Sequence, residues 1–170
     1  MNTLERIAPA IGKLAAKTST SRGGTACLEI EPRDAHAVIA RLRDAAQFET
    51  CTFVTAVDHF PAEPRFEVVW QLHSIAHGDR VRIRARVGGA EPKVPTIVDL
   101  YPGAAYGERE CFDMFGVVFQ GHPGLKRLLM PEEYDHFPLR KDFPHQGIEP
   151  DRLYREWDRA RHLKSPEAAQ

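Results

Sequence analysis

Hydrophobic and polar positions divide the chain into a patterned part, up to residue 116, and a part after it without clear periodicity. Helices are predicted over 33–47, 95–101 and 104–115, and near the N-terminus, where apolar residues recur at helical spacing: Leu4, Ile7, Ile11 and Leu14. β-branched, aromatic or alternating stretches predict strands over 27–31, 51–60, 65–75 and 79–87. The stretch 18–25 is predicted to be a loop. This order predicts an α+β fold, in which a mostly antiparallel sheet carries helices on one face.

The clearest alternation is DRVRIRARV, residues 79–87, whose apolar residues face one side of the predicted strand. The other side carries four arginines: Arg80, Arg82, Arg84 and Arg86. We expect this strand at or near an edge of the sheet, with a wet face whose charge discourages unwanted pairing. The arginines are interpreted as a solvated face beside acidic neighbours or a partner, or as a nucleic-acid contact. No aromatic residue is interleaved with them, as single-strand binders require.

Prolines interrupt the chain repeatedly after residue 116, and the segment nevertheless contains many leucine and aromatic residues. The stretch FPLRKDFP, residues 137–144, is predicted to be extended and stiff, because proline fixes φ and removes a backbone donor. Disordered segments are poor in apolar residues, so this tail is expected to wrap its own domain or to lie along another protein. We therefore expect an α+β domain, 1–116, and an extended proline-rich tail that docks on a partner, 117–170. A helical stripe over 150–163 would enter a partner groove or fold back.

Composition and charge narrow the class of protein. The chain has 170 residues, enough for one domain with a core, and 23 basic against 24 acidic residues give a formal net charge of -1. General nucleic-acid binders usually show a marked excess of positive charge. Three widely spaced cysteines fit reduced thiols in a cytoplasmic protein. No apolar run approaches the roughly 20 residues that cross a bilayer, and the N-terminal helix is expected to pack on the domain rather than to be a targeting signal.

The sequence carries none of the common motifs for nucleotide, cluster or acyl chemistry, since GxGxxG, GxxxxGK[ST], CxxC and GxSxG are all missing. His73 and His77 are four residues apart, but across a strand end and a turn, which gives a metal site little support. His122 and His145 stand beside prolines and are interpreted as loop histidines that bond backbone. An autonomous enzyme is hard to build from these residues.

Charged and aromatic residues are mixed most densely in ERECFDMFG, residues 108–116. On a helix, Glu108 shares a face with Cys111, Phe112 and Phe115, so at least one carboxylate lies against apolar surface. Burying an unpaired charge costs several kcal/mol, so arginine or lysine partners are expected. Arg109 would pair locally, and the more distant candidates are Arg140 and Lys141. The alternative is a surface helix with incidental acids.

Taken together, ERECFDMFGVVFQGHPGLKRLLMP (108–131) and YDHFPLRKDFP (134–144) resemble the C subunit of the proton-pumping NADH–quinone oxidoreductase, respiratory complex I. The family pattern combines Glu-Arg-Glu, Asp-Met-Phe-Gly, His-Pro, a basic-Leu-Leu-Met step and Pro-Leu-Arg-Lys-Asp, in this order and spacing. Two positions depart from it. His136 stands where the family usually has glycine, and Tyr106 where a tryptophan is usual nearby.

The resemblance implies a non-catalytic structural subunit of the peripheral arm, which docks onto the D subunit near the quinone site and takes part in the enzyme only as a subunit of the translocase. It implies no cofactor in this chain, with flavin, iron–sulfur clusters and quinone in partner subunits. The implied location is the cytoplasmic side of the bacterial inner membrane, held there indirectly through the complex and without nucleic acid. The expected partner-interface residues are Glu108, Arg109, Glu110, Asp113, His122, Lys126, Arg127, Leu139, Arg140, Lys141, Asp142 and Phe143.

Within this interface, FPLRKDFP is interpreted as a docking strap, in which Arg140 offers planar, bidentate hydrogen bonding to a carboxylate. Other functions stay open beside this one. The same type of subunit occurs in membrane-bound hydrogenases, formate hydrogenlyase and quinone reductases with other electron donors. From another class, the chain would be a free-standing nucleic-acid-binding α+β domain that uses Arg80 to Arg86, or a small metal-dependent enzyme.

Overall fold

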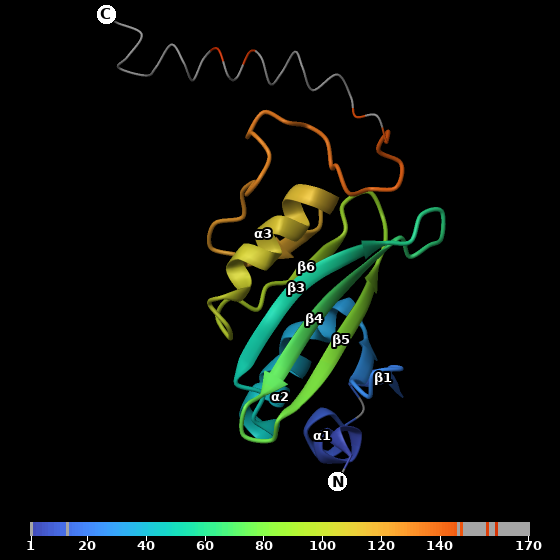
Figure 1. Cartoon of the computed structure of the whole chain (residues 1–170), viewed down its shortest axis with the longest axis vertical. Helices are drawn as coiled ribbons and strands as arrows, with labels where there is room; N and C mark the ends of the chain where they lie inside the picture. The colour runs from blue at the N-terminus through green and yellow to red at the C-terminus, as the bar shows by residue number, and fades with distance from the viewer. Residues whose placement is uncertain (1, 13, 146, 148–155, 157–158, 160–170) are drawn as a thin grey trace, which may run out of the picture.

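The computed structural model describes residues 2–12, 14–145, 147, 156 and 159 of the 170-residue chain (Figure 1). Its helices are α1 (Thr3–Ile11), α2 (Ala35–Ala46), which follows a 3-10 turn at Pro32–Asp34, and α3 (Ala104–Phe115). The strands are β1 (Ala15–Thr20), β2 (Ala26–Ile30), β3 (Thr50–Asp58), β4 (Phe66–Ser74), β5 (Asp79–Val87), β6 (Lys93–Pro95) and β7 (Val118–Gln120).

The first five strands form one sheet in the order β1-β2-β5-β4-β3, and β6 pairs with β7 in a second, small sheet. In the larger sheet β2 and β5 run parallel, and the other neighbours run antiparallel. The predicted α+β class with a mostly antiparallel sheet is therefore confirmed.

Strand β5 lies in the middle of the sheet, so the prediction that residues 79–87 form an edge or near-edge strand was wrong. After β2 the chain passes through α2, β3 and β4, and β5 then returns to pair with β2. The arginines do form a partly exposed face with acidic neighbours, as one of the two interpretations held. Arg84 Nη2 lies 2.6 Å from Glu29 Oε1, and Glu67 lies 3.8 Å from guanidinium nitrogens of both Arg84 and Arg86.

Two other local predictions were wrong. Residues up to Thr20 belong to β1, not to a loop, because the polar edge strand is held by backbone pairing with β2 and carries no apolar alternation that a sequence pattern could detect. Residues 95–101 form the end of β6 and a turn, in which the Tyr101 amide donates to the Ile97 carbonyl oxygen at 2.9 Å. The Ile97 amide itself donates to a side chain of α3, so it does not enter a helical ladder.

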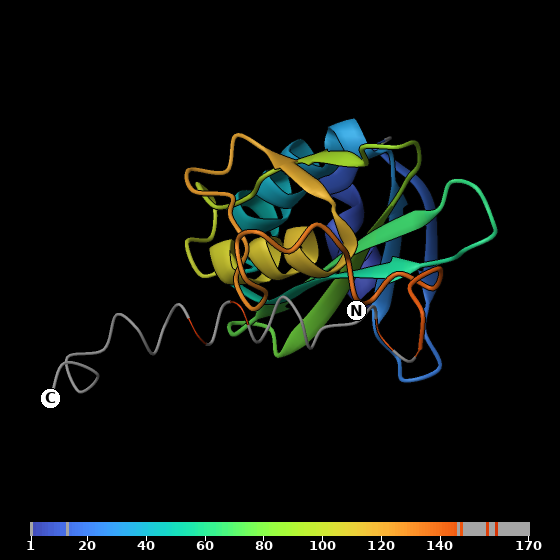
Figure 2. The same cartoon turned by 90° about the horizontal axis from the view of Figure 1, so that it is seen from above.

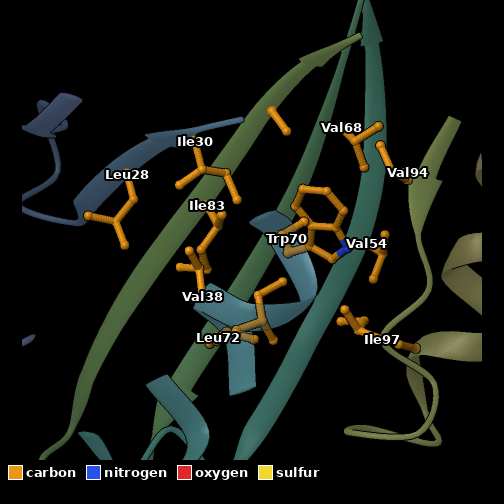
Figure 3. Packing of buried hydrophobic residues seen from close by; sticks show 14 of the residues in the cluster. Leu28, Ile30, Val38, Val54, Val68, Trp70, Leu72, Ile83, Val94 and Ile97 are labelled. Atoms are coloured by element: carbon orange, nitrogen blue, oxygen red, sulfur yellow. The ribbon is translucent and has the colours of Figure 1, made fainter. Parts of the chain in front are cut away.

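The core lies between the inner face of the sheet and the helices α1 and α2, which both pack on that face. Figure 3 shows Trp70 inside this cluster, with Val54 and Val68 nearby. The amphipathic helix α1 buries Ile7 and Ile11, which confirms that the N-terminal helix packs on the domain.

Helix α3 packs against β3, the strand at one edge of the sheet. Gly107 allows this close approach, because a Cβ added there would lie 3.1 Å from the Val54 carbonyl oxygen. Covering an edge strand with a helix is one way in which proteins prevent unwanted strand pairing. The helix thus protects the sheet and is itself held in a fixed position beside it.

The segment that follows α3 packs on the same domain. Gly116 ends the helix at a φ of 77°, and Val117 and Phe119 then enter the core with 0% and 2% exposure. Figures 1 and 2 both show the segment up to residue 145 (orange) lying against α3 (yellow). The α+β domain and the first part of the predicted tail therefore share one core, while the stripe predicted over 150–163 falls largely outside the described residues.

Candidate functional site

Helix α3 organises the residues that the sequence pointed to. It carries Glu108, Arg109, Glu110 and Asp113, and the segments 93–97 and 125–143 pack against it. Glu108 and Asp113 have 0% exposure, whereas Glu110 is exposed. The first two therefore act on their own chain, and any contact they influence outside it passes through the segments that they hold.

Glu108 is buried and accepts hydrogen bonds from two neutral donors. Its Oε1 accepts the Ile97 amide at 2.8 Å, and its Oε2 accepts the Thr96 hydroxyl at 2.5 Å. Burial raises the pKa of Glu108 to about 7, although the hydrogen bonds from Thr96 and Ile97 favour the charged form. The expected arginine or lysine partner of Glu108 was wrong, because no ion pair to it forms within the described part of the chain. Two neutral donors take its place.

Asp113 is buried with an ion pair and three backbone donors. Its Oδ2 accepts the amides of Leu128, Leu129 and Met130 at 3.0, 2.6 and 2.9 Å, and Arg127 Nη1 lies 2.7 Å from Oδ1. Burial opposes the charge of Asp113, but the amides and Arg127 outweigh it and hold its pKa below the usual value. An arginine partner for a buried acid is thus confirmed here, but the partner is Arg127 rather than Arg140 or Lys141.

Two arginines fasten the 125–131 loop to α3. The Arg109 guanidinium donates to the carbonyl oxygens of Lys126 and Arg127 at 3.1 and 2.8 Å, so it bonds backbone rather than a neighbouring acid. The Arg127 guanidinium carbon lies 5.8 Å from the ring centroid of Tyr134 and 5.3 Å from that of Phe137. Cation–π contacts of this kind hold a guanidinium against apolar surface.

The FPLRKDFP segment is fastened to the end of α3. Arg140 Nε donates to the Phe115 carbonyl oxygen at 2.7 Å, and its guanidinium carbon lies 4.1 Å from the Phe137 ring centroid. The Leu139 amide donates to the Met114 carbonyl oxygen at 3.2 Å. Gly116 leaves room for this arrangement, because an added Cβ would lie 2.8 Å from Phe137. The residue chosen as a bidentate donor to a carboxylate, Arg140, thus bonds a carbonyl of its own chain.

The bidentate arginine of this region is Arg65, which the sequence interpretation missed. It donates to both oxygens of Asp58, at 3.0 and 2.8 Å, and to both oxygens of Asp142, at 2.9 and 2.7 Å. The Lys141 amide also donates to Asp58, at 2.8 Å. Burial of Asp58 is outweighed by these donors, which lower its pKa well below the ordinary range. One signal in the sequence could have indicated this pair: Asp58 stands at the end of a predicted strand, and Arg65 follows Pro61 and Pro64 at the start of the next.

The other predicted interface residues are placed as follows. Lys126, Leu139, Lys141 and Asp142 are exposed on the 125–143 segment, where Phe143 is partly buried. His122 is partly buried in the loop after β7, where its Nδ1 accepts the Gly124 amide at 3.0 Å and its Nε2 lies 3.3 Å from the Ala105 carbonyl oxygen. The structure therefore brings all twelve predicted residues to α3 or to the segment that wraps its C-terminal end.

Metal binding and membrane insertion find no support among the described residues. No group of three or more histidine, cysteine, aspartate or glutamate side chains there could hold a metal ion. His77 Nε2 instead lies 2.9 Å from Gln47 Oε1. None of the described helices is long and apolar enough to cross a membrane.

Comparison with known proteins decides the family. A family model described as "Respiratory-chain NADH dehydrogenase, 30 Kd subunit" matches residues 28–149, which include α3 and the segment wrapped on it. The chain belongs to this family. The resemblance that the motifs over 108–144 indicated is thereby confirmed.

Relatives in the family are named as the C subunit of NADH-quinone oxidoreductase. The protein of Salinispora tropica is 40% identical over 150 residues, which cover 86% of this chain and 61% of that protein. The protein of Roseiflexus sp. is 40% identical over 143 residues, covering 83% of this chain and 82% of that one. The chain spans about three fifths of the length of its Salinispora relative.

Solved structures agree with the fold. A trypsin-resistant fragment (1–134) of Nqo5 superposes with a TM-score of 0.64 at 29% identity, covering 72% of this chain and 99% of that one. A chain of the membrane-bound sulfane sulfur reductase, an archaeal respiratory membrane complex, superposes with a TM-score of 0.67 at 23% identity. That match covers 92% of this chain and 87% of the other, and it concerns the fold alone.

Proposed function

We propose that this chain is a non-catalytic structural subunit of the peripheral arm of a proton-translocating NADH–quinone oxidoreductase. It docks onto the homologue of the D subunit near the quinone site and helps to hold the arm together. Its family and the names of its relatives support this assignment. As part of the translocase, the chain takes part in the enzyme's reaction without catalytic residues of its own.

The proposal depends mainly on one observation: the charged motif residues hold surface loops on α3. Asp113, Arg109 and Arg127 hold the 125–131 loop on α3, and Arg140 holds the strap at the end of the same helix. These charged residues thus shape a protein surface, as we expect in a subunit whose role is assembly. A catalytic site would instead keep such groups available to a substrate.

The redox groups of the complex belong, in this proposal, to partner subunits. Flavin, iron–sulfur clusters and quinone are bound there, and this chain positions the subunits that carry them. The chain lies on the cytoplasmic side of the bacterial inner membrane and is attached to it indirectly, through the complex. The described residues contain no helix that could serve as a membrane anchor, which fits an indirect attachment.

A second candidate is the equivalent subunit of a related complex, such as a membrane-bound hydrogenase or a quinone reductase with another electron donor. Its support is that the fold is shared with a chain of the membrane-bound sulfane sulfur reductase. Nucleic-acid binding has less support, because Arg84 and Arg86 are engaged by Glu29 and Glu67 on the sheet face.

The test is purification of the tagged full chain from membranes extracted with a mild detergent. Co-elution of a homologue of the D subunit, together with NADH-dependent quinone reduction in the eluate, would support the leading proposal. The same partner with hydrogenase activity instead would favour the second candidate. A monomer that elutes without any partner would refute both.

A further inference from the structure

Two exposed leucines lie on the segment that wraps the C-terminal end of α3. Leu129 is 66% exposed and Leu139 is 52% exposed, although the residues on either side of them are partly buried or bonded to the domain. We propose that these two leucines are the apolar anchors by which the chain docks. They enter two apolar sockets on a folded partner subunit, and the rim around these sockets carries charges of both signs. This inference rests on the proposed function and names the part of the chain that makes the contact.

The loop that presents Leu129 is fixed from beneath. Three consecutive amides, those of Leu128, Leu129 and Met130, donate to one buried carboxylate oxygen of Asp113. Met130 packs against the core, and Leu128 is partly buried, so the side chain between them is the one that projects. A backbone held by three such bonds loses little conformational entropy when its side chain is bound.

The loop that presents Leu139 is fixed at Leu139 itself and at the two residues that follow it. The Leu139 amide donates to the Met114 carbonyl oxygen, Arg140 donates to Phe115, and the Lys141 amide donates to Asp58. These contacts join the loop to the end of α3 and to the end of β3. Leu139, like Leu129, thus projects from backbone that is hydrogen-bonded to the domain.

The ring of Phe137 joins the two loops into one surface. Guanidinium carbons of Arg127, from the first loop, and Arg140, from the second, lie 5.3 and 4.1 Å from its centroid. The loops also bond adjacent residues of α3, Asp113 and Met114. Two apolar side chains on one rigid support lose little conformational entropy when a partner binds them, and this preorganisation favours affinity.

The charges around the leucines indicate what kind of partner fits. Five exposed charged side chains within four residues of them in the sequence form no ion pair with any described residue: Lys126, Lys141, Glu132, Glu133 and Asp135. An apolar centre with a polar rim of both signs is typical of a protein–protein interface. A lipid surface or a nucleic acid would instead favour a rim of positive charge alone. The occupant is therefore a protein subunit with complementary charges around two apolar sockets.

The experiment compares the tagged full chain with a Leu129→Ser, Leu139→Ser double variant, purified from mild-detergent membrane extracts. Ile75→Ser is the matched control, because Ile75 is 69% exposed and lies in the β4–β5 turn, at the opposite end of the sheet from the wrapped segment (Figure 1). We expect the double variant to recover its partner at a level lower by roughly tenfold or more, and the control to match wild type. The melting temperature of each isolated chain should stay within about 2 °C of wild type, as for other exposed positions.

Two results would overturn the inference while leaving the proposed function intact. One is normal recovery of the partner by the double variant. The other is a fall in the melting temperature of the isolated double variant by more than about 5 °C, which would mean that the leucines pack on their own chain. If wild type itself recovers no partner, the proposed function fails and the inference fails with it.

Discussion

Each half of α3 carries one acidic side chain with 0% exposure. The surroundings of these two side chains shift their pKa values in opposite directions. In the first half, Glu108 meets two neutral donors and no cation among the described residues, and its pKa rises to about 7. In the second half, Asp113 meets three amides and the Arg127 guanidinium, and its pKa falls. Equal burial therefore does not give equal charge, because the number and charge of the donors decide which form of the acid is stable.

Because of this difference, the two halves of α3 have different roles. The second half holds a charged carboxylate at every physiological pH, and the 125–131 loop depends on that charge. The first half holds a carboxyl group that changes its protonation state near neutrality, against the turn that follows β6. The carboxylate that holds the surface proposed for docking is thus the one whose charge does not vary with pH.

Removing the charge of Asp113 should have the largest effect. We expect Asp113→Asn to lower the free energy of unfolding of the full chain by about 3–5 kcal/mol at pH 7, because Arg127 would stay buried without its partner. Urea unfolding followed by fluorescence measures this change. Glu110→Gln, on the exposed face of the same helix, is the control and should stay within about 0.5 kcal/mol of wild type. A similar small change for Asp113→Asn would remove the contrast between the two halves.

Glu108→Gln should stabilise the protein at high pH. A buried acid whose pKa is raised contributes fully below its ordinary pKa of 4.5, and this contribution is lost as the pH rises toward and through about 7. The difference between the two values corresponds to about 3 kcal/mol, which is the upper limit of the gain at pH 8. Gln keeps an oxygen acceptor for Ile97. Urea unfolding at pH 5 and pH 8 tests this, and a variant whose stability follows the same pH dependence as wild type would contradict it.

Arg140→Ala should destabilise the isolated chain by about 2 kcal/mol, because a charged donor to Phe115 and the contact with the Phe137 ring are both lost. Lys141→Ala removes the neighbouring exposed side chain and should leave the melting temperature unchanged. Equal melting temperatures for the two variants would mean that the Arg140 side chain contributes nothing to the stability of the fold.

Thr96→Val should have the smallest effect, about 1 kcal/mol at pH 7, since it removes one hydrogen bond to Glu108. The loss of a donor to the charged form also moves the pKa of Glu108 further up. Stability declines from the ordinary pKa of 4.5 up to the pKa in the folded chain, so the pH at which this decline ends should move upward relative to wild type. A downward movement would show that the Thr96 hydroxyl does not stabilise the carboxylate.

Pattern and spacing predicted much of the scaffold, because burial on one face imposes a period that a sequence displays directly. The amphipathic residues of α1 and α2, and the alternation of β5, are examples. Pattern and spacing did not predict β1, because this strand is polar and is held by backbone pairing. They also did not predict the position of β5 in the sheet, because that position depends on a crossover that no local pattern records. Gly107 could not be understood either without knowing that Val54 lies opposite it.

For the candidate site, the sequence by itself predicted that ERECFDMFG and FPLRKDFP contribute to one surface, and it determined that at least one acid of ERECFDMFG lies against apolar surface. It also determined the family, through motifs whose order and spacing persist along the chain. Only the tertiary structure decided that Arg127 pairs with Asp113, that Glu108 has no cation among the described residues, and that Arg65 rather than Arg140 grips two carboxylates. The reason is physical. Hydrogen bonds and ion pairs between distant segments depend on which surfaces meet after folding. A sequence pattern shows which face of an element is buried, because burial imposes a period, but it does not show which distant side chains meet there.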